Sequence, residues 1–264
     1  MSLAFSCIVA HTPLLMPTIG RDSIGLIAKT RDAMLRLEQE LYLSQPETVI
    51  VVSPHGQGLP DSVTIDCSPE FTADFEEFGD LVTKNRWRGD VLLIDRIRED
   101  FNAKHLPLSL SSVSTLDYGC TVPLWYLTQH LPKVKVVPVF TSGLDAKNHY
   151  EIGRQMKDEI LNATKRVAVV ASADLSHRVG ENSPQGLSPR GVAYDEKVQE
   201  LVRNRDLVGL TDIDESWANE ASACGDKVLA VLAGIMDEVQ HEPEILSYEK
   251  PLGVGYLVAN LKMA

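Results

Sequence analysis

Short apolar runs alternate along the chain with longer segments in which apolar residues recur at helical spacing. The apolar runs predict strands at 3–10, 48–53, 61–67, 134–140, 166–172 and 254–259. The amphipathic segments predict helices at 21–43, 90–104, 121–130, 146–163, 191–204 and 214–237. Strands that alternate with helices are typical of an α/β fold, so we expect a central, mostly parallel sheet flanked by helices. Neither a repeat nor a linker interrupts the pattern, which favours one domain over 1–264.

Three places depart from this regularity. Residues 71–88 combine acidic and aromatic side chains and predict a loop, serving as a lid or a subunit interface. Pro138 lies inside a predicted strand, although proline removes a donor from the strand ladder. Pro123 fits the first turn of the helix predicted over 121–130, where its missing N–H is not needed.

Composition narrows the class of protein. The chain has 264 residues, 44% of them hydrophobic, and a net charge of -12, which argues against a nucleic-acid partner. No apolar run is long enough to cross a membrane, and the first residues lack the basic region and cleavage site of a signal peptide. The cysteines are widely spaced, which favours reduced thiols and a cytoplasmic location. They are Cys7, Cys67, Cys120 and Cys224.

Two histidines follow predicted strands and stand close to prolines. His11 comes after the run that ends at Ala10 and precedes Thr12-Pro13, and His55 follows Ser53-Pro54. The carboxyl ends of parallel strands face the active-site crevice of α/β proteins, so two imidazoles delivered there can share one metal ion. The alternative is two buried or loop histidines without a ligand. The repeated context favours the metal.

A third ligand must come from elsewhere in the chain. The segment 219–225 offers the carboxylate of Glu220 and the thiolate of Cys224. Two histidines with a carboxylate suit non-haem Fe(II), whereas two histidines with a thiolate suit zinc or copper. A lone cysteine before an apolar helix is often a core residue, and a glutamate at a helix start often serves the helix dipole.

Asp174 and His177 follow the strand predicted at 166–172. A carboxylate near an imidazole can orient it and hold a proton on it, which suits a general acid or base. The alternative is a helix-capping aspartate beside a surface histidine. Cys120 fits the N-terminus of a helix, where the pKa of a thiol falls. His130, His149 and His241 lie in polar contexts and are expected to be solvated.

Several short motifs occur together in one order from end to end of the chain. They are 10–15 (AHTPLL), 51–56 (VVSPHG), 116–119 (LDYG), 171–178 (ASADLSHR), 223–225 (ACG) and 253–256 (GVGY). In this order and spacing the chain resembles the class III (LigB-type) extradiol dioxygenase superfamily. Within it, the chain most resembles the Memo-like branch, including the LigB-like domain of AmmeMemoRadiSam system proteins.

The resemblance implies a role for each matching residue. It places His11 and His55 on non-haem Fe(II), and it makes His177 an acid/base for a catechol-like substrate that reacts with O2. In ring-cleaving members the third ligand is a glutamate. The resemblance places that position on Cys224, and the Memo-like branch also has a cysteine there. Tyr118 stands where ring-cleaving members have a further catalytic histidine, and Asp174 matches the Memo-like pattern.

Two functions therefore follow from the sequence. The first is an extradiol ring-cleavage dioxygenase-like oxidoreductase with one metal ion, Fe(II) before zinc or copper, that takes a small-molecule substrate and O2. The second is a Memo-like metal-binding redox or interaction protein without ring cleavage. The resemblance also implies a homo-oligomer.

Overall fold

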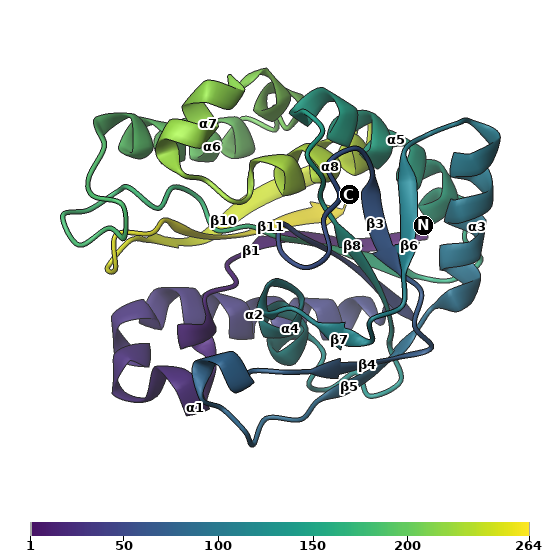
Figure 1. Ribbon diagram of the computed structural model, residues 1–264, viewed down its shortest axis with the longest axis horizontal. Helices are drawn as coiled ribbons and strands as arrows, with labels where there is room; N and C mark the ends of the chain where they lie inside the picture. The colour runs from purple at the N-terminus through teal and green to yellow at the C-terminus, as the bar shows by residue number, and fades with distance from the viewer. Residues whose placement is uncertain (1, 264) are drawn as a thin grey trace.

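A central sheet of eleven strands organises the protein in this computed structural model, which describes residues 2–263 (Figure 1). Its strands are β1 (Leu3–Val9), β2 (Thr48–Ser53), β3 (Val63–Asp66), β4 (Glu70–Ala73), β5 (Arg86–Gly89), β6 (Leu108–Ser111), β7 (Thr115–Leu116), β8 (Lys135–Phe140), β9 (Val167–Ser172), β10 (His241–Glu249) and β11 (Tyr256–Met263). The main path runs β10-β11-β1-β9-β2-β8-β5-β4-β7, and β3 and β6 branch from β8.

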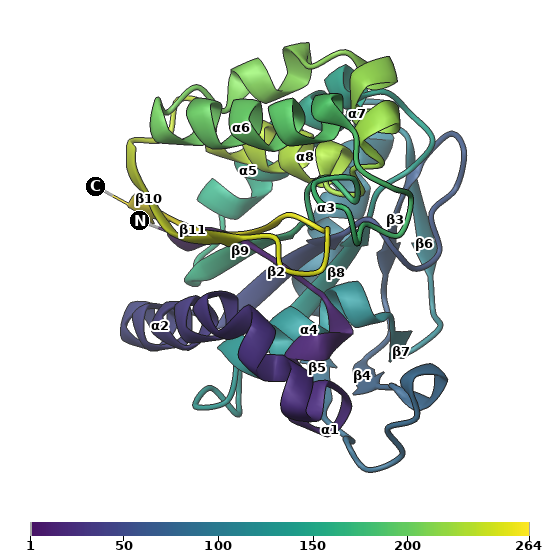
Figure 2. The same ribbon diagram turned by 90° about the vertical axis from the view of Figure 1, so that its left-hand side faces the viewer.

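Helices cover both faces of this sheet. The α-helices are α1 (Pro17–Gly20), α2 (Ala28–Ser44), α3 (Val91–Ala103), α4 (Tyr118–Leu127), α5 (Ala146–Leu161), α6 (Pro189–Arg203), α7 (Glu215–Ala221) and α8 (Asp226–Met236). Short 3-10 helices are η1 (Pro13–Leu15), η2 (Arg21–Ile27), η3 (Glu76–Phe78) and η4 (Val208–Asp212). In Figure 2, α2 and α4 lie below the sheet, and α3, α5, α6 and α8 lie above it.

The parallel strands β1, β9, β2 and β8 form the centre of the sheet. Every residue of β2 and β9 is buried, because each strand packs against a separate apolar core on each face. The antiparallel strands β11 and β10 complete one side of the sheet. The predicted α/β class, with a mostly parallel sheet between helices, is therefore confirmed.

The loop expected over 71–88 is confirmed in its middle, at 74–85, and is wrong at both ends. β4 and β5 pair there as an antiparallel hairpin, and Phe71, Phe75 and Trp87 are buried against the core that contains α2 and α4. Phe71 and Trp87, which looked like part of a lid, instead lie on strands. Together with β6, β7 and β10, this hairpin adds strands that the apolar pattern did not predict, whereas β3 lies within the strand predicted at 61–67.

Pro138 is accommodated by a gap in the sheet. On one side, β8 pairs with β5 through Lys135 and Val136, and with β3 through Val139 and Phe140. The interruption between these two partners falls at Pro138, so the missing N–H leaves no ladder bond unmade on that side.

Three predicted helices differ from the structure. The helix expected over 214–237 is two helices, because Ser222 adopts a left-handed backbone (φ 51) that ends α7. The helix expected from Thr121 begins at Tyr118, where the Asp117 side chain accepts a hydrogen bond from the N–H of Cys120, so Pro123 lies inside the helix. The first turns of the helix expected over 21–43 are 3-10 in type. None of the helices within 2–263 is long and apolar enough to cross a membrane.

Candidate metal centre

Three neighbouring strands deliver polar side chains to the same edge of the sheet. β9 lies between β1 and β2, and all three run parallel. His11, Asp174 and His55 each stand two residues beyond the last residue of their strand. Cys224 reaches the same place from the break between α7 and α8. The parallel sheet therefore gathers residues from four distant parts of the chain.

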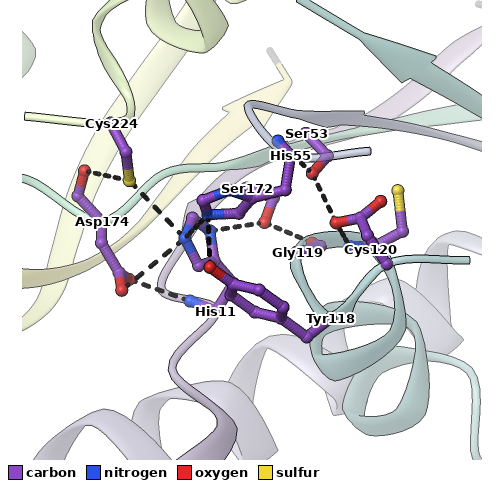
Figure 3. Close-up of polar contacts among 10 residues, drawn as sticks. His11, Ser53, His55, Tyr118, Gly119, Cys120, Ser172, Asp174 and Cys224 are labelled. Carbon is purple, nitrogen blue, oxygen red and sulfur yellow. Dashed lines mark hydrogen bonds and ion pairs between the residues drawn. The ribbon is translucent and has the colours of Figure 1, made fainter. Parts of the chain in front are cut away.

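Three of these side chains form a compact group of metal-ligand atoms (Figure 3). The Nε2 atoms of His11 and His55 are 3.2 Å apart, and the Sγ of Cys224 is 3.6 Å from the Nε2 of His11. All three ligand atoms lie within 4.8 Å of one another. Two donors bound to one ion at about 2.0–2.3 Å are separated by at most about 4.5 Å, so the separations of 3.2 and 3.6 Å suit a shared ion.

Ser172 fixes the tautomer of His11. The hydroxyl of Ser172 donates its only proton to the carbonyl of Gly119 at 2.5 Å. It must therefore accept the hydrogen bond that joins it to Nδ1 of His11 at 2.9 Å. A proton on Nδ1 leaves the lone pair of Nε2 facing Cys224 and His55, which is the arrangement that a metal ligand requires.

Burial sets the charge of the cluster. Burial lowers the pKa of His11 to about 4. Burial and the neighbouring His11 lower the pKa of His55 to about 4 as well. Both imidazoles are therefore neutral at pH 7. Burial also raises the pKa of Cys224 well above its usual value, with Asp174 adding to the shift. Neutral imidazoles are ready to bind a metal, whereas the thiol needs a nearby cation to hold it as a thiolate.

Asp174 connects the segments that carry two of the ligand atoms. Its Oδ1 accepts a hydrogen bond from the backbone N–H of His11 at 3.0 Å, and its carbonyl accepts one from Gly225 N–H at 3.1 Å. Its Oδ2 lies 3.7 Å from Nε2 of His11. Burial raises the pKa of Asp174 to about 6. The expected pairing with His177 is not made, since no hydrogen bond joins the two side chains in the described chain.

Tyr118 packs beside His55. Its hydroxyl oxygen is 3.0 Å from Nε2 of His55, and the two rings lie 4.5 Å apart. Asp117 accepts from Ser53 Oγ at 2.9 Å, which ties the start of α4 to the end of β2. Gly119 permits this approach, because a Cβ there would lie 2.4 Å from Ser53 Oγ. Burial raises the pKa of Tyr118 to about 12, and the charge of a Cys224 thiolate contributes to this shift.

The remaining predicted residues fall in different environments. His177 is half-buried beside the cluster, and its Nε2 is buried without a hydrogen-bond partner within residues 2–263. Glu220 lies outside the cluster and pairs with Arg190 at 2.8 Å. Burial raises the pKa of Cys120 well above its usual value, which is opposite to the expected effect of a helix N-terminus. His149, expected in solvent, is buried and accepts from Ser142 N–H at 3.0 Å.

A cavity of about 330 Å³ lies beside His55, and Gly56, the next residue in the chain, and Asp117 are among the residues that line it. Phe140 and Val113 give it apolar walls. Five acidic residues line it, namely Asp66, Asp74, Glu76, Glu77 and Asp117. This volume matches a small-molecule site, and its lining favours neutral or cationic molecules.

Comparison with known proteins places this arrangement in a family. The model of the catalytic LigB subunit of aromatic ring-opening dioxygenase matches residues 6–259. The chain belongs to the LigB family. Protein CA_C1420 of Clostridium acetobutylicum is 27% identical to this LigB chain over 271 residues, which cover 99% of this chain and 58% of that protein. The LigB chain thus spans only 58% of the length of this curated relative.

A solved structure shares the fold of this LigB chain. It is the crystal structure of uncharacterized protein JW3007 from Escherichia coli K12. The alignment covers 98% of this chain and 99% of that protein's chain, with a TM-score of 0.68 at 16% identity. At this identity the likeness shows the fold alone.

The donor set of this LigB chain fits the divalent metal that LigB enzymes use. Two neutral imidazoles and one thiol meet at a point, and no lysine or arginine pairs with them in the part of the chain that the structure describes. His11, His55 and Cys224 would hold the ion.

Proposed function

We propose that the protein is a mononuclear metal-dependent oxidoreductase of the extradiol ring-opening type, with Fe(II) held by His11, His55 and Cys224. The observation that carries the proposal is the convergence of three ligand atoms within 4.8 Å at the carboxyl edge of a LigB-family sheet. Bound iron would supply a Lewis acid that brings a diol substrate and O2 together.

The protein's own residues would manage the protons. The buried Nε2 of His177 has no partner within residues 2–263, which leaves it free to accept a proton from a substrate hydroxyl. Tyr118, whose pKa is raised to about 12, would hold its proton at neutral pH and would donate rather than accept. Asp174 would keep the backbone of His11 in place through its hydrogen bond.

The substrate proposed for this site is a small catechol-like molecule. The cavity beside His55 has a volume of about 330 Å³, which accommodates one aromatic ring with short substituents. We also propose that the chain works as one domain over 1–264, in a cytoplasmic homo-oligomer, without a nucleic-acid or membrane partner.

A second candidate is a Memo-like metal-binding redox or interaction protein without ring cleavage. Cys224 favours it, because a thiolate donates more charge than a carboxylate and prefers softer metals such as copper. The greater length of CA_C1420 is compatible with a further protein module as partner of this domain.

Metal analysis of protein purified without oxygen tests the proposal. The wild type and Glu220→Ala should bind one iron per chain, because Glu220 lies outside the cluster. Cys224→Ala and His55→Ala should lose it while remaining folded. Iron-loaded wild type should then turn catechols into yellow ring-opened products in air. Full iron retention in both cluster variants would overturn the metal site, and bound metal with no product from any catechol would favour the second candidate.

A further inference from the structure

The hydroxyl of Tyr118 lies among the candidate ligand atoms. Its oxygen is 3.0 Å from Nε2 of His55, which is itself 3.2 Å from Nε2 of His11. The Tyr118 ring is held at the start of α4 and packs against His55 on one side and edge-on against Phe78, at 5.4 Å, on another. Figure 3 shows the hydroxyl pointing towards the two imidazoles. The oxygen therefore belongs to the same group of donors.

The hydrogen bond between Tyr118 and His55 competes with a metal ion. In the tautomer that carries its proton on Nδ1, the Nε2 atom of His55 has a single lone pair, which either accepts from the tyrosine hydroxyl or binds the ion. Metal binding therefore frees the hydroxyl at a place close to the ligand atom. Two ligands of one ion can be up to about 4.5 Å apart, so the 3.0 Å separation allows Tyr118 to bind the same ion.

We propose that Tyr118 is a fourth protein ligand of the metal when the metal is ferric iron. The inference rests on the proposed metal site at His11, His55 and Cys224 and adds an anionic oxygen to it. A trivalent iron favours such a hard donor more than divalent iron does, and tyrosinate is an established axial ligand of haem iron. His55 and Phe78 hold the ring so that little side-chain freedom is lost on binding.

The ferric state would first require that Fe(II) lose one electron to an external one-electron acceptor, such as the ferricyanide of the test below. The O–H bond of Tyr118 breaks, its oxygen binds the ferric ion, and the proton passes to the buffer. Such a ligand occupies a position that a diol or O2 would need. The oxidised site would then be a closed resting form, and an external one-electron reductant such as dithionite would reopen it.

The test uses the full chain loaded with Fe(II) without oxygen and oxidised by one equivalent of ferricyanide. Resonance Raman spectra excited in the visible absorption band are recorded for the wild type, Tyr118→Phe and Tyr126→Phe. Tyr126 is the matched control, because it is a buried tyrosine of the same helix whose hydroxyl donates to the carbonyl of Leu15 at 2.7 Å. Ferric affinity is measured by competition with a chelator.

We expect enhanced tyrosine ring modes in the wild type and in Tyr126→Phe, and none in Tyr118→Phe, whose ferric affinity falls at least about tenfold. Ring modes absent from the wild type overturn the inference, whether or not the variants fold. So does a Tyr118→Phe variant with equal or higher ferric affinity, because the hydroxyl is then only a competitor for His55. Iron that binds to none of the proteins overturns the proposed function as well.

Discussion

At the scale of single residues, Ser172 decides which nitrogen of His11 is available. Its hydroxyl proton is committed to the carbonyl of Gly119, so it can only accept from Nδ1 of His11. We expect Ser172→Ala to weaken metal binding about 10–100-fold, because the ring loses its preferred tautomer and orientation. Isothermal titration of metal-free protein with Fe(II) under nitrogen measures this change.

Ser142→Ala is the control for this measurement. Ser142 is also a buried serine that contacts a histidine, His149, but this pair lies outside the cluster. Its loss should leave the metal affinity unchanged. Equal affinities for the wild type and Ser172→Ala would show that the serine does not set the tautomer.

The sequence predicted individual residues unevenly. His11 and His55 stand directly after strands, so the sheet alone brings them to one edge. Whether Glu220 or Cys224 reaches the cluster depends on where α7 ends. The sequence between these two residues does not reveal that end. His149 looked polar because its neighbours are polar, yet the helix turns it inward to accept from the N–H of Ser142.

At the scale of elements, Asp195 connects α6 to β10 and to the segment that carries His177. Its buried carboxylate accepts from the N–H of Ser176 at 2.8 Å and from the hydroxyl of Tyr248 at 2.7 Å. Burial raises the pKa of Asp195 to about 7, from an ordinary value of 3.8. The folded protein therefore holds this proton more tightly than the unfolded chain does.

The stability of the metal-free protein should consequently fall as the pH rises from 4 through about 7. The contribution of Asp195 is complete below pH 3.8 and is lost as the pH passes the folded value, at a cost of a few kcal/mol. Urea unfolding at several pH values measures this slope. Asp195→Asn cannot titrate and should flatten the slope, and an unchanged slope would mean that Asp195 is already ionised at low pH.

The sequence predicts the ends of helices and strands where local chemistry sets them. It misses the ends that are set by packing. The helices α3, α5 and α6 agree with the apolar spacing to within two residues at each end. The break at Ser222 requires a left-handed backbone at a residue type that seldom adopts one, so nothing local predicts it. The hairpin of β4 and β5 was missed because its strands have only four residues each.

At the scale of the whole molecule, negative charge surrounds the site. The net charge is -12, and the cavity beside His55 has five acidic lining residues. We expect a catechol with an aminoethyl substituent to bind more tightly than catechol, and 3,4-dihydroxybenzoate to bind least. Titrations at low and high salt measure this order, and salt should narrow the differences because it screens the charges. Tightest binding by the carboxylate-bearing compound would contradict the electrostatic argument.

The wide spacing of His11, His55 and Cys224 along the chain has a consequence for folding. These donors meet only after β1, β2 and β9 have paired and the loop between α7 and α8 has closed over them. An unfolded chain therefore has no preformed chelate, and the proposed ion would bind the native state almost exclusively. By mass action, metal supply then shifts the folding equilibrium, so a shortage of iron would lower the amount of folded protein before any reaction is measured.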